Sequence, residues 1–265
     1  MGAAPVLLVG CGRLGAAMLR GWLASKTLKP ADVTIMAPRV NAAMQGFAAQ
    51  GVRVEPAPQW RARTVVLAVK PKVGADALKS ALPLLADDAV VVSVMAGVRA
   101  ASLTPLLKPG QSLARVMPST GTAHGAGVAC LHAEYARARD HAEALFAPIA
   151  TVIGLEREDD LDAATALCGS GPALVFAQVA ALAKGAEALG IAPDLAARMA
   201  RATLTSAAAS VANDPRTLDE LIAEVASPGG TTEAGLKVLA GALEPLMKDA
   251  VGAAHRRAGE LSETS

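Results

Sequence analysis

Pro5-Val6-Leu7-Leu8-Val9-Gly10-Cys11-Gly12-Arg13-Leu14-Gly15 is the stretch that decides the fold of the amino-terminal half. Its apolar start predicts a short buried strand, and the apolar residues from 16 to 23 recur at helical spacing. A strand, a glycine turn and a helix are the context in which G-x-G-x-x-G predicts a dinucleotide site, the alternative being a purely structural turn. Gly10 permits the tight turn, Gly12 lets the backbone approach a pyrophosphate, and Gly15 lets the helix pack on the strand.

The end of the next predicted strand, Val33-Thr34-Ile35-Met36, favours NADPH over NADH. An NAD-type site places an acidic residue near this point to bind the ribose 2′-hydroxyl. Here the chain reads Ala37-Pro38-Arg39, so no carboxylate repels a 2′-phosphate and Arg39 can pair with it. We therefore expect NADPH, with NADH as a weaker alternative. The other interpretation of Arg39 is a solvated residue at a helix start.

Strands and helices continue to alternate up to about residue 155, which predicts an α/β fold with a Rossmann-like, doubly wound parallel sheet. The further strands are expected at residues 64–69, 89–94, 112–117, 126–131 and 151–153. Ligands of such sheets bind at the carboxyl ends of the strands. Lys70, Ala96-Gly97 and Met117-Pro118-Ser119-Thr120 fall at these ends, although for any one of them alone ordinary strand-to-helix turn chemistry is the preferred explanation.

Beyond about residue 155 the chain is predicted to be all helical, which gives two domains, 1–155 and 156–265. The helix from 173 to 189 is apolar nearly all round its first half, so it needs cover on several sides. We expect a homodimer built on this region, against the alternative that its helices bury one another. Residues 163–183 carry no charge, but Gly169-Ser170-Gly171-Pro172 is expected to break that run, so no membrane span is predicted.

Ser227-Pro228-Gly229-Gly230-Thr231-Thr232 precedes another apolar-periodic run, so a helix is predicted to begin near Thr231. The first N–H groups of a helix have no intrahelical partner and carry partial positive charge. With two threonine hydroxyls beside them, they suit a small carboxylate or phosphate. The alternative is a loop that ends in a Thr N-cap.

Composition excludes several functions. The net charge is +1 and only 2% of the residues are aromatic, which argues against nucleic-acid binding. The four histidines lack zinc-site spacing, so no metal is predicted. Cys11, Cys130 and Cys168 are far apart in sequence and are interpreted as free thiols of a reducing compartment. With no signal-peptide pattern at the amino terminus, a cytoplasmic protein is expected.

Four stretches, taken in order, resemble the pyrroline-5-carboxylate reductase family: Gly10–Gly15 with Met18, Leu67–Pro71, Gly169–Ala173, and Ser227–Thr232 with Ala234-Gly235-Leu236. The resemblance covers almost the whole chain, and its last two stretches are the most specific. It implies an amino-terminal NAD(P)-binding domain, a helical domain that interlocks dimers or higher oligomers built from dimers, and reduction of the cyclic imine 1-pyrroline-5-carboxylate to L-proline.

The resemblance also implies roles for residues. The turn at Gly229 and the amides of Gly230, Thr231 and Thr232 would hold the substrate carboxylate, and the Thr232 hydroxyl would face the imine nitrogen as the catalytic group. Ser170 would line the same pocket. The cofactor would be bound by Gly10, Gly12, Arg13, Leu14, Gly15, Arg39, Ala68, Val69, Lys70, Pro71, Ala96, Gly97, Met117 and Ser119.

The chain departs from the family pattern after Met117-Pro118, where Ser119-Thr120-Gly121 replaces the usual Asn-Thr-Pro. This departure leaves open a related imine or ketone reductase that acts on another small carboxylate. A cofactor-binding sensor without turnover is a third interpretation. The intact Ser227–Thr232 stretch argues against it, because a sensor needs no carboxylate site.

Overall fold

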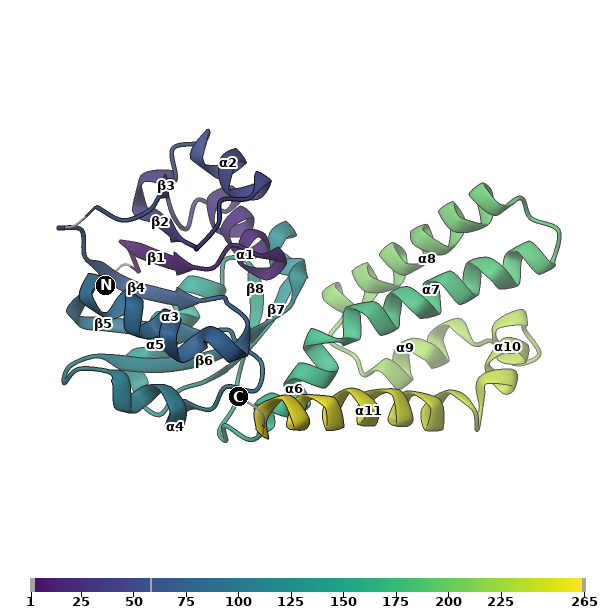
Figure 1. The fold of residues 1–265 in the computed structure, drawn as a ribbon. Helices are drawn as coiled ribbons and strands as arrows, with labels where there is room; N and C mark the ends of the chain where they lie inside the picture. The colour runs from purple at the N-terminus through teal and green to yellow at the C-terminus, as the bar shows by residue number, and fades with distance from the viewer. Residues whose placement is uncertain (1–2, 58, 264–265) are drawn as a thin grey trace. The chain divides into compact units, whose positions relative to one another are not determined.

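The computed structural model describes residues 3–57 and 59–263. Within them, eight strands form one sheet in the order β3-β2-β1-β4-β5-β6-β7-β8 (Figure 1). The strands are β1 (Val6–Val9), β2 (Val33–Met36), β3 (Arg53–Val54), β4 (Ala62–Leu67), β5 (Leu85–Ser93), β6 (Ser112–Pro118), β7 (Gly127–His132) and β8 (Ala150–Gly154). The first six strands have the order of a dinucleotide-binding sheet. The chain adds β2 and β3 on one side of β1 and then β4, β5 and β6 on the other, so the strand order reverses between β1 and β4.

The sheet confirms the predicted fold class, with two differences in detail. All strand pairs are parallel except β6 and β7, which run antiparallel with Met117 opposite Cys130. A connection of residues 119–126 is too short for a parallel crossover, so the chain can only turn back. The two-residue strand β3 was not predicted, because two residues are too few to display a period.

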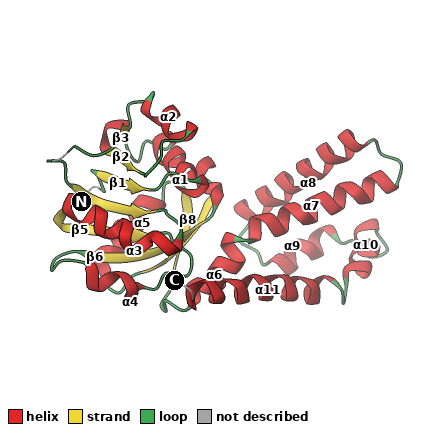
Figure 2. Cartoon of the chain, in the orientation of Figure 1, coloured by secondary structure: helices red, strands yellow, loops and turns green. Residues whose placement is uncertain are grey.

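Helices cover both faces of the sheet (Figure 2). Alternate strand residues point to opposite faces, so Val6 and Leu8 belong to one core cluster while Leu7 and Val9 belong to the other. Helices α1 (Arg13–Ala24), α2 (Ala42–Ala48) and α5 (Ala136–Phe146) pack on the first face, and α3 (Gly74–Ala81) and α4 (Ala100–Leu103) pack on the second. Trp22 of α1 anchors the first cluster, stacking edge-on against Phe146 and donating its indole N–H to the Leu145 carbonyl at 2.9 Å.

The rest of the chain is helical, as predicted. It comprises α6 (Asp160–Ala164), a π-helical turn (Thr165–Gly169), α7 (Gly171–Ala188), α8 (Pro193–Asn213), α9 (Leu218–Val225), α10 (Thr231–Leu239) and α11 (Leu243–Glu263). The chain groups into two compact units: residues 1–169 with 254–265, called the sheet unit here, and residues 170–253, called the helical unit. The domain boundary predicted between residues 155 and 156 stays a prediction.

The sequence Gly169–Pro172 does not interrupt the helical run as strongly as expected. Only Ser170 lies outside a helical turn, and its backbone angles stay in the right-handed helical region. Asp160–Ala188 is therefore long and apolar enough to span a bilayer by length and composition alone, with a mean hydropathy of 1.6 over an 18-residue stretch. A single helix of this kind is weak support for a membrane protein. Of the same 18-residue stretch, 11% is buried within the structure.

The helical unit buries few of its apolar side chains. Ala183, Ala196 and Ala200 form a small cluster between α7 and α8. By contrast Phe176 is 64% exposed and Val238 is 78% exposed. A groove of about 490 Å³, lined by Phe176, Val179 and residues of α8, lies between the same two helices.

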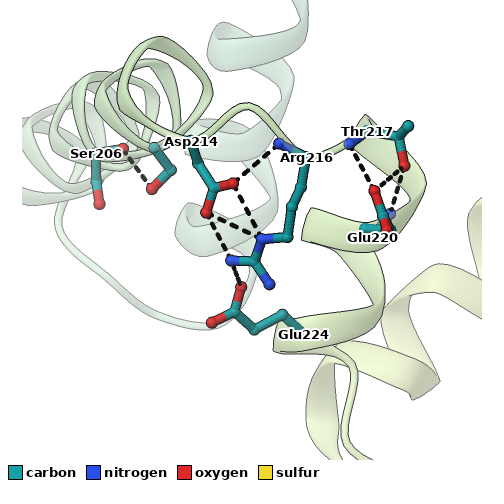
Figure 3. Close-up of polar contacts among 7 residues, drawn as sticks. Ser206, Asp214, Arg216, Thr217, Glu220 and Glu224 are labelled. Atoms are coloured by element: carbon teal, nitrogen blue, oxygen red, sulfur yellow. Dashed lines mark hydrogen bonds and ion pairs between the residues drawn. The ribbon is translucent and has the colours of Figure 1, made fainter.

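Polar contacts hold the connection from α8 to α9 (Figure 3). The Arg216 guanidinium binds Asp214 at 2.6 Å and also pairs with Glu224. Its hydrogen bonds hold the pKa of Asp214 at about 2. Thr217 and Glu220 form a reciprocal cap at the start of α9, in which the Thr217 N–H donates to the Glu220 carboxylate at 2.8 Å.

Candidate active site

The glycine turn lies at the point where the strand order reverses. Gly10 follows β1 with a φ of +92°, and a Cβ built on it would lie 2.6 Å from the Ala68 carbonyl oxygen. A Cβ on Gly15 would lie 2.6 Å from the Gly10 carbonyl oxygen. Both positions therefore require glycine, one for conformation and contact and the other for the close packing of α1 on the turn.

Gly12 is different, because a Cβ there would meet nothing within 4 Å. It is exposed, and it forms the N-cap of α1 without a side-chain hydrogen bond. The N-cap position of α1 thus borders open space, which leaves room at the helix start for the pyrophosphate that dinucleotide sites bind there. Arg13 is exposed and Leu14 is half-buried beside it.

The other predicted cofactor residues lie at the carboxyl ends of neighbouring strands. Ala68 and Val69, which the sequence placed inside a strand, lie just past β4 and contact the turn at Gly10. Ala96 packs with Met117 in one small apolar cluster. Lys70 and Pro71 begin a 3₁₀ turn after Val69, and Gly97 adopts a φ of +75°. Because parallel strands end at one edge, these residues share the edge that carries the glycine turn.

Arg39 is exposed in the loop between β2 and α2. A residue of this loop that the sequence interpretation missed is Asn41. Its amide Nδ2 donates to the Cys11 carbonyl at 2.9 Å, and its Oδ1 accepts the Met44 N–H at 3.0 Å. Asn41 thereby caps α2 and ties the Arg39 loop to the glycine turn. An Asn directly before a helical run is an N-cap signal, but the bond to Cys11 is not readable from sequence.

The Ser119 side chain is buried and its Oγ accepts the Val128 N–H at 3.1 Å, which fixes the loop to β7. Its hydroxyl hydrogen can still be donated. Gly121 follows in a tight position, where a Cβ would lie 2.7 Å from the Ala126 carbonyl oxygen. The Ser119-Thr120-Gly121 departure from the family pattern therefore belongs to a well-packed loop.

An ionic network fixes the segment that leads into α6 beside the Gly97 loop. The Arg99 guanidinium binds the carboxylates of Asp159 at 2.5 Å and of Asp162 at 3.2 Å. The hydrogen bond from Arg99 lowers the pKa of the Asp159 carboxyl. Arg115 on β6 binds Glu158 at 2.7 Å. The Glu158 carboxylate also accepts the Ala100 N–H at 2.6 Å.

The predicted carboxylate site lies at the start of α10 in the helical unit. Gly229 has a φ of +72° and donates its N–H to the Glu233 carboxylate at 2.8 Å. Gly230 is the N-cap, and its N–H donates to the Ser227 carbonyl at 2.9 Å, so a bound carboxylate would share that amide with the turn. Thr231 and Thr232 are the first two residues of α10, so their N–H groups have no carbonyl one turn earlier in the helix.

Thr231 and Thr232 are both exposed, whereas Ser170 is half-buried at the start of α7. The structure thus places Ser170 and Thr232 at two separate helix starts of the helical unit. Among the described residues, no group of three or more His, Cys, Asp or Glu side chains is arranged to hold a metal ion.

A glycine turn at the switch point of a sheet with this strand order defines the class of dinucleotide-binding oxidoreductases. Comparison with known proteins narrows the class. Residues 158–261 match the family model described as pyrroline-5-carboxylate reductase dimerisation, and residues 5–97 match the model described as NADP oxidoreductase, coenzyme F420-dependent.

Relatives match along the full length. The chain is 31% identical to the pyrroline-5-carboxylate reductase of Pseudomonas aeruginosa, with 97% of each chain covered. It is 33% identical to that of Glycine max, with 96% of this chain and 94% of the relative covered. A pyrroline-5-carboxylate reductase structure from Coxiella burnetii superposes with a TM-score of 0.88 at 29% identity, covering 98% of this chain and 99% of the other. The chain belongs to the pyrroline-5-carboxylate reductase family.

Proposed function

We propose that this protein reduces 1-pyrroline-5-carboxylate to L-proline with NADPH, the last step of proline synthesis. The observation that carries the proposal is the full-length similarity to relatives of that name, at 31% identity over 97% of both chains. The proposal draws further support from the start of α1 and the start of α10, where Gly12, Thr231 and Thr232 are exposed.

The glycine turn fits the cofactor. Open space beside Gly12 accommodates a pyrophosphate, and the loop after β2 offers Arg39 instead of a carboxylate. When bound, NADPH supplies the hydride. The proposal assigns cofactor contacts to the residues at the strand ends, from Ala68 to Pro71, at Ala96 and Gly97, and at Met117 and Ser119. A related structure from Plasmodium falciparum carries bound NADP, at 20% identity and a TM-score of 0.83.

The start of α10 supplies the substrate site of the proposal. The Thr231 and Thr232 amides would bind the substrate carboxylate, because they combine unsatisfied donors with the positive end of the helix dipole. The Thr232 hydroxyl would orient the imine nitrogen and hold a proton near it. Catalysis then rests mainly on holding the imine carbon in line with the hydride donor and away from water.

An exposed helix start cannot exclude water by itself, so the site needs cover. We assign that cover, and the burial of the exposed apolar residues of α7 to α11, to a second copy of the chain in a homodimer or a larger assembly built from dimers. In the proposal, residues 1–155 bind the cofactor, and residues 156–265 bind the substrate and dimerise. The protein is proposed to work in the cytoplasm, where its thiols stay reduced.

The test is oxidation of NADPH by the purified protein with 1-pyrroline-5-carboxylate, with NADH in parallel and proline identified as the product. Rapid turnover with a preference for NADPH is expected. Tight NADPH binding without turnover would overturn the assigned substrate and favour another cyclic imine or ketone carboxylate. The Ser119-Thr120-Gly121 loop is the specific observation behind that second candidate.

A further inference from the structure

Two of the three cysteines meet in the fold, although 38 residues separate them in sequence. Cys130 lies on β7 and Cys168 lies in the π-helical turn between α6 and α7. Their Sγ atoms are 3.7 Å apart, and the Cys130 thiol donates toward the Cys168 sulfur. Both thiols are free.

The two cysteines differ in accessibility. Cys130 is buried in a cluster with Met117, Leu161 and Ala164, whereas Cys168 is half-buried at its edge. Burial, and after it the neighbouring Cys168, raise the pKa of the Cys130 thiol to about 12. Cys130 is therefore a protonated thiol at neutral pH, and an oxidant from solution reaches Cys168 first.

We propose that Cys130 and Cys168 form an oxidative modification site, a dithiol that a hydroperoxide converts into an intramolecular disulfide. In the first step the Cys168 thiolate attacks the terminal peroxide oxygen, the O–O bond breaks, and the sulfenic acid forms with release of hydroxide from hydrogen peroxide, or of an alkoxide from an organic hydroperoxide. In the second step the Cys130 sulfur attacks the Cys168 sulfur, the S–O bond breaks, and the Cys130 proton leaves with the hydroxyl as water. Two thiols lose two electrons in total, and the peroxide takes them up.

The geometry suits the second step. A disulfide needs its sulfurs about 2.0 Å apart, so the two Sγ atoms must approach by a little under 2 Å, which side-chain rotation and a small shift of the turn can supply. Cys168 lies in a π-helical turn, a rare backbone form that is frequent at functional sites. No other cysteine competes among the described residues, because Cys11 lies buried at the glycine turn, away from this cluster.

The disulfide would join two functionally placed segments. Cys130 lies opposite Met117 in the β6–β7 ladder, and Met117 is one of the residues expected beside the cofactor. Cys168 precedes Ser170, the first residue of the helical unit, by two positions. Oxidation would thus link the π-helical turn at Thr165–Gly169 covalently to β7, and a small dithiol would release it.

The experiment counts thiols in the full-length protein. Protein reduced with dithiothreitol and freed of it should show three thiols when titrated in denaturant, and one after treatment with a modest excess of hydrogen peroxide. The intact mass should fall by two hydrogen atoms, a peptide map should link the segments that contain Cys130 and Cys168, and dithiothreitol should restore all three thiols.

Three variants locate the site. Cys11→Ala should still lose two thiols, whereas Cys130→Ala should lose none to a disulfide and should instead carry a dimedone-reactive sulfenic acid at Cys168. Cys168→Ala should keep both of its thiols under the same treatment. Retention of three thiols by the unsubstituted protein, or a disulfide that includes Cys11, would overturn the proposal and leave Cys130 and Cys168 as small packing residues.

Discussion

The sheet unit and the helical unit differ in how far they bury their large apolar side chains. The sheet unit encloses Leu7, Leu8 and Trp22 completely, because helices from the same chain cover both faces of its sheet. The helical unit buries only small residues such as Ala183 and Ala196, while Phe176 and Val238 stay mostly in solvent. One unit is completed by its own chain, and the other is proposed to be completed by a second copy. The difference predicts that substitutions of large apolar residues will affect folding in the first unit and association in the second.

The largest expected effect is on the sheet unit. Trp22→Ala removes a fully buried indole, its edge contact with Phe146 and its bond to the Leu145 carbonyl. It should lower the free energy of unfolding by about 4 kcal/mol. Urea unfolding at fixed protein concentration, followed by far-ultraviolet circular dichroism, measures it. Val40→Ala, at an exposed site of the same unit, serves as the control and should change stability by less than about 0.5 kcal/mol. Equal effects of the two substitutions would contradict the enclosed core.

The second-largest effect is expected on turnover, from a substitution at the start of α10 in the helical unit. Thr232→Ala removes the hydroxyl proposed to face the imine nitrogen, so kcat should fall about a hundredfold. NADPH binding should stay nearly unchanged, because the glycine turn lies in the other unit. Steady-state kinetics and fluorescence titration of NADPH measure the two quantities, and Thr232→Ser should retain most of the rate. Parallel losses of turnover and cofactor binding would contradict the assigned role.

Association tests the helical unit. Phe176→Asp places a charge on the exposed apolar surface beside the groove between α7 and α8, so the dimer dissociation constant should rise at least about tenfold. Sedimentation velocity over a concentration series measures it. Tyr135→Asp changes a similarly exposed aromatic residue of the sheet unit and should leave the dimer intact. If both variants dissociate alike, the helical unit is not the interface.

A smaller effect is expected on the preference for NADPH over NADH, from a substitution in the sheet unit. Arg39→Ala removes the cation proposed to pair with the 2′-phosphate, so KM for NADPH should rise about tenfold while KM for NADH changes little. Arg13→Ala is the matched control, because Arg13 is also exposed but lies at the glycine turn, where both cofactors are proposed to place their pyrophosphate. It should raise both KM values by similar factors. An unchanged NADPH-to-NADH ratio in Arg39→Ala would make Arg39 an ordinary surface residue.

The smallest effect is the pH dependence of the connection between α8 and α9. Asp214 has a folded-state pKa of about 2, below its ordinary value of 3.8, because it accepts hydrogen bonds from Arg216. A depressed pKa stabilises the fold above the ordinary value, and this stabilisation is lost as the pH falls from about 4 to about 2. Asp214→Asn should therefore melt below the unsubstituted protein at pH 7, and the gap should narrow toward pH 2. A gap of constant size across that range would contradict the assignment.

The amino-acid sequence by itself determined the strands β1 and β2, the glycine turn and the start of α10. Each depends on neighbours a few residues away: a buried strand needs only an apolar run, the turn needs glycine at positions 10 and 15, and the helix begins at Thr231, directly after the turn at Gly229-Gly230. These local signals also carried the family resemblance, and the comparisons confirmed it.

Only the tertiary structure decided the rest. The direction of β7 follows from how a short loop meets the sheet, the bond from Asn41 to the Cys11 carbonyl joins residues 30 apart, and the contact of Cys130 with Cys168 spans 38. The sequence predicted that the helix from 173 to 189 needs cover, but only the structure shows which apolar residues of the helical unit stay exposed, Phe176 and Val238 among them. Contacts of this kind depend on the packing of whole elements, which no local period encodes, because many distant partners are compatible with the same pattern.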